Sequence, residues 1–398
     1  MIIKAAFTAV FLFSVANALA VEALPDLTPI TRPTPIPVDP CLRGGTMTYW
    51  VRARAKPGDG SQKMPFPTIQ QALAVADQNL ACNLDIHVSV GTYSGNLNIS
   101  RNTRILGEGA SAPVLTGSIL NSKGQTLVIH FFNIAGAADI ALSQSGGTLE
   151  LRQVTVSQTR RRSPGPEAGT AVMIKGGAQV VIEQGQLTEN EGQALWISDP
   201  GTRVLTNGLR VEKNKVNPAA MAAAASSDFS HSAAIEVTND ATLLAQNFSV
   251  TDNEFIGVLL HQRARAHFRQ GTVSGTLDFA NSSGIRGGNN FQIMSKAALE
   301  LHGFVSERAQ GFGVIVQDGY LTASTGQINN NVDGIAFMPP LPQANYDIGE
   351  CFAEDISFQG NGVVNGGAIV PLPSVCNMSP PPPQCSQPPN CAFVPWSL

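Results

Sequence analysis

Charged side chains are scarce in this sequence. Lys, Arg, Asp and Glu make up 14% of its 398 residues, whereas about a quarter is usual in a globular protein. The formal net charge is -4, so the sequence also lacks the basic excess that is typical of nucleic-acid-binding proteins. Gly, Ser, Thr, Asn and Gln take the place of the missing charges. The composition argues against a nucleic-acid partner and favours neutral polymers or stacked β-strands.

Long apolar runs are missing after the N-terminus, and no later stretch reaches the roughly 18 residues of a transmembrane helix. The first twenty residues differ, because Lys4 precedes a short apolar run from Ala5 to Val15. The small-x-small sequence Ala18-Leu19-Ala20 then resembles a signal-peptidase site. This pattern predicts a signal peptide over residues 1–20. We therefore expect a secreted protein, extracellular or on the cell surface, with the periplasm as a further possibility.

Cysteines are few, and they lie near the two ends of the sequence. No CxxC spacing or spaced His partner accompanies them, so the ligand pattern of a zinc site is absent. We expect no metal site and no cofactor; calcium is possible, but no motif supports it. In an oxidising compartment these cysteines are expected to form disulfides. Proximity favours, among fifteen possible connectivities, the pairs Cys41–Cys82, Cys351–Cys376 and Cys385–Cys391.

Most of the chain repeats itself. After a Pro-rich leader and a first extended segment (21–55), residues 56–365 contain units of three short strands that each open on a small residue. The short intervals between units agree at roughly 22–25 residues, within the range of solenoid repeats. Three strands per unit predict an all-β fold, a single-stranded right-handed parallel β-helix of about 9–10 coils. Residues 366–398 form a Pro- and Cys-rich tail or cap.

Asparagines recur at one point of the repeat. Each stands three residues after the last inward apolar residue of the second strand, at Asn190, Asn214, Asn253 and Asn331. Stacked coils would align them into a ladder of side-chain amides that bond one another along the axis. We interpret this ladder as structural.

The segment from Gly58 to Gly109 contains GDGS, FPTIQQALAVA, IHVSVGTYSGNLNI and ILGEG. It resembles the opening of the pectin-lyase-like superfamily of β-helical proteins. The resemblance covers roughly residues 56–365 and implies a short N-terminal capping helix, with Ile69, Leu73 and Ala76 as its buried stripe. It implies a fold and not a reaction, because the superfamily includes lyases, hydrolases, esterases, epimerases and non-catalytic surface proteins.

Three intervals of the repeat are longer than the others. Their extra residues all fall between the second and third strands, at roughly Arg160–Ala168, Lys215–Ser230 and Ser274–Ser283. Insertions at one point of a solenoid project from one face, which is commonly the binding face. Tolerated loop growth is the alternative.

The third strands carry an unusually apolar outward row. Strand alternation turns outward the residues Met173, Trp196, Glu236, Ile315 and Ala336. Such a row needs a cover, so either the inserts fold over it or it is a platform on which Trp196 stacks against a sugar ring. On the platform interpretation, Trp196 and Glu236 contact substrate.

The first strands carry a different outward row, which is polar: Arg152, Glu183, Asn207, Gln246, Arg269, His302 and Ser324. Arg269 and the insert residue Arg161 are predicted to hold the carboxylates of an acidic polysaccharide. A solvated polar face is the alternative.

Known catalytic patterns are largely missing. No GHG element, calcium-binding carboxylate cluster or complete methylesterase signature is present. Asp278, within GTLDFANSSG, resembles a methylesterase nucleophile segment, and Asp228 with His231 on the longest insert forms a second, weak acid–base candidate. Whether the chain is an enzyme stays open; if it is, we expect a polysaccharide lyase, hydrolase or esterase.

Two functions follow from these patterns. The first is a secreted protein that binds or modifies a polysaccharide or cell-surface glycan through its insert-bearing face. The second is a non-catalytic, adhesin-like rod whose repeats provide length and stability.

Overall fold

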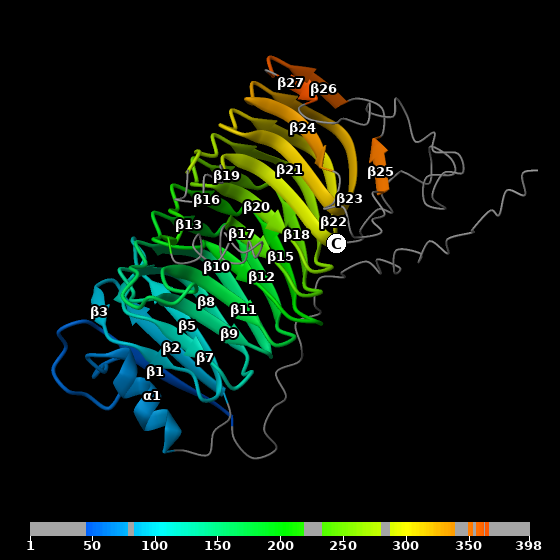
Figure 1. The fold of residues 1–398 in the computed structure, drawn as a ribbon. Coiled ribbons are helices and arrows are strands. Elements are labelled where there is room, and N and C mark those ends of the chain that lie inside the picture. The colour runs from blue at the N-terminus through cyan, green and yellow to red at the C-terminus, as the bar shows by residue number, and fades with distance from the viewer. Residues whose placement is uncertain are drawn as a thin grey trace, which may run out of the picture.

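The computed structural model describes residues 45–78, 83–218, 233–279, 287–338, 349–352, 356–361 and 363–365. Within these ranges the strands join into one continuous hydrogen-bonded system in which successive coils pair in parallel. The chain is a right-handed parallel β-helix, which confirms the predicted fold class. The described strands that pair in sequence from β1 to β25 number twelve, so the stack has more coils than the 9–10 predicted. Figure 1 shows the coils stacked from the N-terminal end to the C-terminal end.

Each coil contributes to three sheets, which we number in chain order within a coil. The first sheet contains β1 (Thr46–Val51), β2 (Asn83–Ser89), β5 (Asn102–Glu108), β12 (Gln179–Glu183), β15 (Arg203–Asn207), β18 (Thr242–Gln246) and β25 (Gly349–Phe352). The longer strands β8 (Leu127–Ala135), β10 (Thr148–Ser157), β21 (Arg265–Ser274), β22 (Asn289–Glu307) and β23 (Phe312–Asn329) also add a part to it.

The second sheet contains β3 (Thr92–Ser94), β6 (Val114–Thr116), β13 (Gln186–Thr188), β16 (Arg210–Glu212), β19 (Ser249–Thr251), β26 (Ile356–Gln359) and the ends of the five longer strands. The third sheet contains β4 (Leu97–Asn98), β7 (Ile119–Asn121), β9 (Ile140–Ser145), β11 (Thr170–Lys175), β14 (Leu195–Ile197), β17 (Ala233–Val237), β20 (Ile256–Leu260), β24 (Asp333–Met338), β27 (Val363–Asn365) and the starts of β22 and β23.

A helix, α1 (Ile69–Asp77), lies at the N-terminal end of the stack (Figure 1). The hydroxyl of Thr68 accepts a hydrogen bond from the backbone N–H of Gln71, which caps the first turn. The apolar side of α1 is buried in the main core and contacts β1 and β2. Among the described residues no helix is long and apolar enough to cross a membrane.

Left-handed backbone conformations make the corners of the coil. One residue with positive φ bends the chain from the first to the second sheet, at Phe131, Gln153, Gln184, Gly208, Asn247, Gln270, Gly303 and Thr325. Two successive such residues return the chain from the third to the first sheet, at Gly146–Gly147, Gly176–Gly177, Asn239–Asp240, Gln262–Arg263 and Ser295–Lys296. Because the same corner recurs from coil to coil, the strands stay in register.

The predicted asparagine ladder is confirmed. Asn190 Nδ2 donates to Asn214 Oδ1 at 2.8 Å, and Asn214 Nδ2 donates to Asn253 Oδ1 at 2.9 Å. The ladder is interrupted in the next two coils, where Thr276 and Ala309 occupy the ladder position. It resumes at Asn331, whose Nδ2 donates to Asn361 Oδ1 at 3.2 Å.

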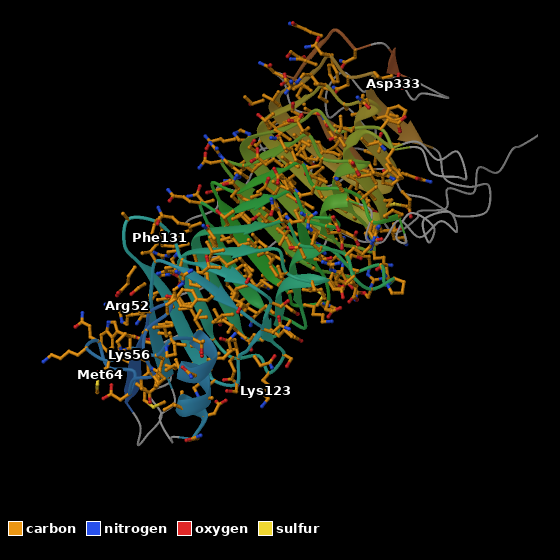
Figure 2. All side chains as sticks on the ribbon, turned by 90° about the vertical axis from the view of Figure 1, so that its left-hand side faces the viewer. Arg52, Lys56, Met64, Lys123, Phe131 and Asp333 are labelled. Carbon is orange, nitrogen blue, oxygen red and sulfur yellow. The ribbon has the colours of Figure 1, made fainter. Side chains whose placement is uncertain are left out.

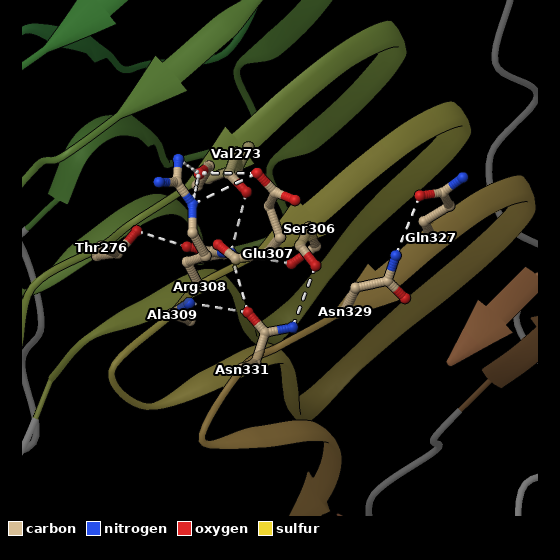
Figure 3. Close-up of polar contacts among 11 residues, drawn as sticks. Val273, Thr276, Ser306, Glu307, Arg308, Ala309, Gln327, Asn329 and Asn331 are labelled. Atoms are coloured by element: carbon tan, nitrogen blue, oxygen red, sulfur yellow. Dashed lines mark hydrogen bonds and ion pairs between the residues drawn. The ribbon is translucent and has the colours of Figure 1, made fainter. Parts of the chain in front are cut away.

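Asn290, from the start of β22, fills this interruption. Its Oδ1 accepts from the hydroxyl of Thr276 at 2.6 Å, and its Nδ2 donates to the carbonyl oxygens of Val273 and Glu307. Asn331 Oδ1 accepts from the backbone N–H of Ala309 on the same ladder (Figure 3). A buried amide from another part of the coil therefore bonds the carbonyl oxygens that an asparagine at position 309 would have bonded.

Inward apolar side chains fill the stack along its whole length. Phenylalanines from four neighbouring positions pack edge to face, with ring centroids 4.9 Å apart for Phe248 and Phe268, 5.7 Å for Phe268 and Phe291, and 6.5 Å for Phe291 and Phe304. Side chains line the structure from Arg52 near its N-terminal end to Asp333 near its C-terminal end (Figure 2). The core runs along the stack and leaves the outer faces of the sheets for other contacts.

Candidate functional site

The structure places each of the three inserts between the second and third sheets, as predicted. The first lies between β10 and β11, the second between β16 and β17, and the third between β21 and β22. Asp228 and His231, in the second insert, lie outside the described residues. All three inserts leave the stack at the same corner of the coil, which defines the insert-bearing face.

The first and second inserts are tied together. The side-chain amide of Asn217 donates to the carbonyl oxygens of Gly165, Pro166 and Ala168 at 3.0, 3.1 and 3.0 Å. Its Oδ1 accepts from Arg161 Nη1 at 3.1 Å. Asn217 is 1% exposed, so these bonds form in a place that excludes water. A single buried asparagine thus holds the first insert in one conformation.

Two carboxylates anchor the base of the first insert. Asp139 Oδ1 accepts from the backbone N–H groups of Arg162 at 2.7 Å and Ser163 at 2.8 Å. Glu191 Oε1 meets Arg160 Nη1 at 2.7 Å. The hydrogen bond from Arg160 lowers the pKa of Glu191. Burial acts to raise the pKa of Asp139, but the backbone donors of Ser163 and Arg162 lower it on balance.

The outward row of the third sheet is mostly covered. The strand register aligns Met173, Trp196, Glu236, Leu259, Gln292, Ile315 and Ala336 from coil to coil, and all of these except Trp196 are buried. Of the two interpretations, the structure therefore favours a cover over an open platform.

Residues at the base of the inserts supply part of this cover. Val216 of the second insert belongs to a separate buried apolar cluster with Leu259 and Met294, and Phe279 of the third insert packs against it. This second core lies outside the sheets and joins the inserts to the outward row. Apolar contact of this kind explains why the row is rich in apolar residues.

Glu236 lies at the centre of a buried polar group on this face. Its Oε2 accepts from Gln193 Nε2 at 2.6 Å, and its Oε1 meets His261 Nε2 at 3.0 Å. The side chain of Glu236 is 0% exposed. A buried carboxylate needs such partners, so the geometry gives Glu236 a supporting position, although the sequence predicted contact with substrate.

Trp196 is half-buried and is the member of the outward row that keeps exposed surface. The ammonium nitrogen of Lys175 lies 6.0 Å from the centroid of its ring, near the limit of cation–π attraction. Trp196 stands directly opposite Met173 and Glu236 on the neighbouring strands. An aromatic surface and a cation therefore lie side by side on the outer face of the third sheet.

The outer face of the first sheet carries the predicted polar row and a network of ion pairs. His130 Nε2 meets Glu150 Oε1 at 3.0 Å, and Arg152 Nε meets Glu150 Oε1 at 2.6 Å and Glu183 Oε2 at 3.2 Å. These groups are partly exposed, so each pair contributes little to stability. This part of the row fits a solvated polar face, which the sequence analysis gave as the alternative to carboxylate binding.

The C-terminal part of the same row differs. Arg269, His302 and Ser324 stand opposite one another on β21, β22 and β23. His302 Nδ1 lies 2.9 Å from Ser324 Oγ. Next to this row, His267 Nδ1 meets Glu300 Oε2 at 2.7 Å, and His267 is buried. The sequence placed these residues in one row but could not show which side chains meet.

The remaining predicted site residues do not gather at one place. Arg269 belongs to the first sheet, whereas Trp196, Glu236 and Arg161 belong to the insert-bearing face. Asp278 lies at the base of the third insert, where its Oδ1 accepts from the backbone N–H of Gly287 at 3.0 Å and its own N–H donates to Gln310 Oε1 at 2.8 Å.

The predicted disulfides cannot be placed, because the cysteine side chains lie outside the described residues, as do the predicted signal peptide and tail. The described residues contain no group of three or more His, Cys, Asp or Glu that could hold a metal ion. The sequence missed Gln193, His261, Lys175 and Asn217, the partners that build the insert-bearing face. They belong to different coils, and the register between coils is the signal that relates them.

No family model matches the chain, and no curated protein matches it. Among solved structures, the chain is similar to the pectate lyase Pel9A at 12% identity and a TM-score of 0.47, over 82% of this chain and 79% of that one. It is similar to the A-module of the Azotobacter vinelandii mannuronan C-5 epimerase AlgE6 at 10% identity and a TM-score of 0.40, over 76% and 94%.

It is also similar to a lacto-N-biosidase from Eubacterium ramulus at 11% identity and a TM-score of 0.35, over 78% and 68%. At these identities no residue of this chain takes a role from those proteins. The chain is a right-handed parallel β-helix, and the chemistry of its faces rests on its own side chains.

Proposed function

We propose that this protein is secreted and binds a polysaccharide on its insert-bearing face. The observation that carries the proposal is the pairing of half-buried Trp196 with Lys175, whose ammonium nitrogen lies 6.0 Å from the ring centroid. A flat aromatic surface suits the apolar face of a sugar ring. The neighbouring ammonium suits a hydroxyl or carboxylate oxygen on the same sugar.

The fixed conformation of the insert-bearing face supports this role for Trp196. Asn217 ties the first insert to the second, and Asp139 and Glu191 fix the base of the first insert. Met173 and Glu236, opposite Trp196 in the row, are buried. A preformed site loses less conformational entropy when a ligand binds. Arg161 lies in the first insert on the same face, with one guanidinium nitrogen bound to Asn217.

Binding to polygalacturonate, alginate and a neutral xylan, measured by isothermal titration calorimetry, tests the proposal. We expect the wild-type protein to bind at least one of them, and Trp196→Ala to weaken binding by about fivefold or more, since truncating an aromatic anchor commonly costs more than about 1 kcal/mol. The matched control is Trp50→Ala. Trp50 stacks on His87 on the first sheet, with ring centroids 5.1 Å apart, and should leave binding unchanged.

A non-catalytic rod is the second candidate function. The burial of most of the outward row favours it, because a covered face offers little surface to a ligand. If the wild-type protein binds none of the three glycans, or if both tryptophan variants bind as well as the wild type, the insert-bearing face is not the binding site. The first of these outcomes supports the rod.

A further inference from the structure

A serine and a histidine meet on the outer face of the first sheet, away from the insert-bearing face. Ser324 Oγ lies 2.9 Å from His302 Nδ1. The two residues stand directly opposite each other on β23 and β22. A hydroxyl held within hydrogen-bond distance of an imidazole is the arrangement that activates a serine nucleophile.

The other described histidines have different partners. His87, His130, His261 and His267 each meet a glutamate oxygen, at 2.6, 3.0, 3.0 and 2.7 Å. Nδ1 of His302 instead meets a hydroxyl. With the ring proton on Nε2, this nitrogen accepts the Ser324 hydroxyl hydrogen and is placed to remove it.

A cation lies beside His302, on the side away from Ser324. Arg269 stands opposite His302 on β21. Burial lowers the pKa of Arg269, and the charge of Glu300 acts against that effect. The guanidinium keeps its charge under all ordinary conditions, so the pair lies in a locally positive field, which favours a developing negative charge.

We propose that Ser324 and His302 form a nucleophile–base pair that hydrolyses carboxylic esters of small acyl groups. The low exposure of Ser324, 9%, restricts access and favours an acetyl group over a long acyl chain. This activity goes beyond glycan binding and lies on a different sheet.

The reaction balances without a cofactor. Ser324 Oγ attacks the carbonyl carbon, and its proton passes to His302 Nδ1. The tetrahedral oxyanion collapses, the bond to the ester oxygen breaks, and the alcohol leaves with the proton from His302. Water then attacks the acyl-serine, His302 takes one of its protons and returns it to Ser324 Oγ, and the carboxylic acid is released.

The experiment uses the full chain with two probes, a biotinylated fluorophosphonate and p-nitrophenyl acetate. We expect mass spectrometry to locate the fluorophosphonate label on Ser324 in the wild-type protein. Ser324→Ala and His302→Ala should each lose at least about 100-fold in the hydrolysis rate, the lower end of the range for a general base. Ser157→Ala, an outward serine at the end of β10 on the second sheet, is the matched control and should keep full activity.

p-Nitrophenyl decanoate should react at least about tenfold more slowly than the acetate. The proposal is wrong if the wild-type protein is not labelled, if the label is on another serine, or if Ser324→Ala hydrolyses the acetate as fast as Ser157→Ala does. Labelling of the wild-type protein decides the matter even if Ser324→Ala does not fold. The glycan-binding test depends on Trp196 on the third sheet, so either proposal can fail while the other holds.

Discussion

Single amides hold neighbouring coils together in this molecule. Asn214 accepts at Oδ1 from both the backbone and the side chain of Asn190, and its Nδ2 donates to Asn253 Oδ1 and to the carbonyl of Leu187. Asn214→Ala would leave buried partners without their bonds, at about 1–3 kcal/mol for an unsatisfied buried group. We expect a lower midpoint in guanidinium denaturation followed by circular dichroism.

Asn98→Ala is the matched control for this prediction, because Asn98 is an exposed asparagine on β4. It should change the free energy of unfolding by less than about 0.5 kcal/mol, as surface substitutions usually do. If the two variants unfold at the same denaturant concentration, the ladder amides do not stabilise the stack.

The ladder also shows which contacts of single residues could be predicted from the sequence and which could not. Regular spacing from the second strand was enough to predict Asn190, Asn214, Asn253 and Asn331. The spacing could not predict Asn290. The side-chain amide of Asn290 reaches the ladder from the start of β22, which belongs to the third sheet and follows the third insert. The contact between His302 and Ser324 depends likewise on rotamers, which strand alternation does not specify.

Charged side chains fasten the first insert, which lies outside the sheets. Asp139 and Glu191 hold the base of the first insert, and both pKa values are lowered in the folded protein. A lowered pKa means that these contacts stabilise the fold fully above the ordinary carboxyl pKa of about 4. The contribution is lost as the pH falls through the folded values.

The double variant Asp139→Asn, Glu191→Gln tests this anchoring. At pH 7 we expect trypsin to cleave it after Arg160, Arg161 or Arg162 several-fold faster than the wild-type protein, because the insert opens more often. At pH 3 the first insert of the two proteins should exchange amide hydrogens at similar rates. Equal cleavage at pH 7 would show that the two carboxylates do not fasten the insert.

Insert positions could be predicted from the unequal repeat lengths, and the strand bounds confirm them. What the inserts do could not be predicted. Both a cover and a platform fit an apolar outward row, and the choice depends on contacts such as those of the buried cluster that contains Val216 and Leu259. Those contacts join residues of different coils, and sequence spacing alone does not relate the insert to the row beneath it.

The whole molecule is a stack in which each coil contacts its neighbours, so its stability is expected to vary along the axis. Phe268 packs between Phe248 and Phe291 in the interior and is 0% exposed. Phe268→Ala would leave a cavity between coils, at about 3–5 kcal/mol for a buried phenylalanine. Phe358, on β26 near the C-terminal end of the described stack, is partly buried.

Phe358→Ala should therefore cost less, about 1–2 kcal/mol, in proportion to the smaller apolar area that it removes from the core. Hydrogen exchange measured by mass spectrometry separates the two effects. Phe268→Ala should raise exchange in β18, β21 and β22 together, because a gap between coils weakens both neighbours, whereas Phe358→Ala should raise exchange near β26 and leave β18 unchanged. A uniform rise in both variants would mean that the stack unfolds as one unit, and that its coils do not act as separate stabilising layers.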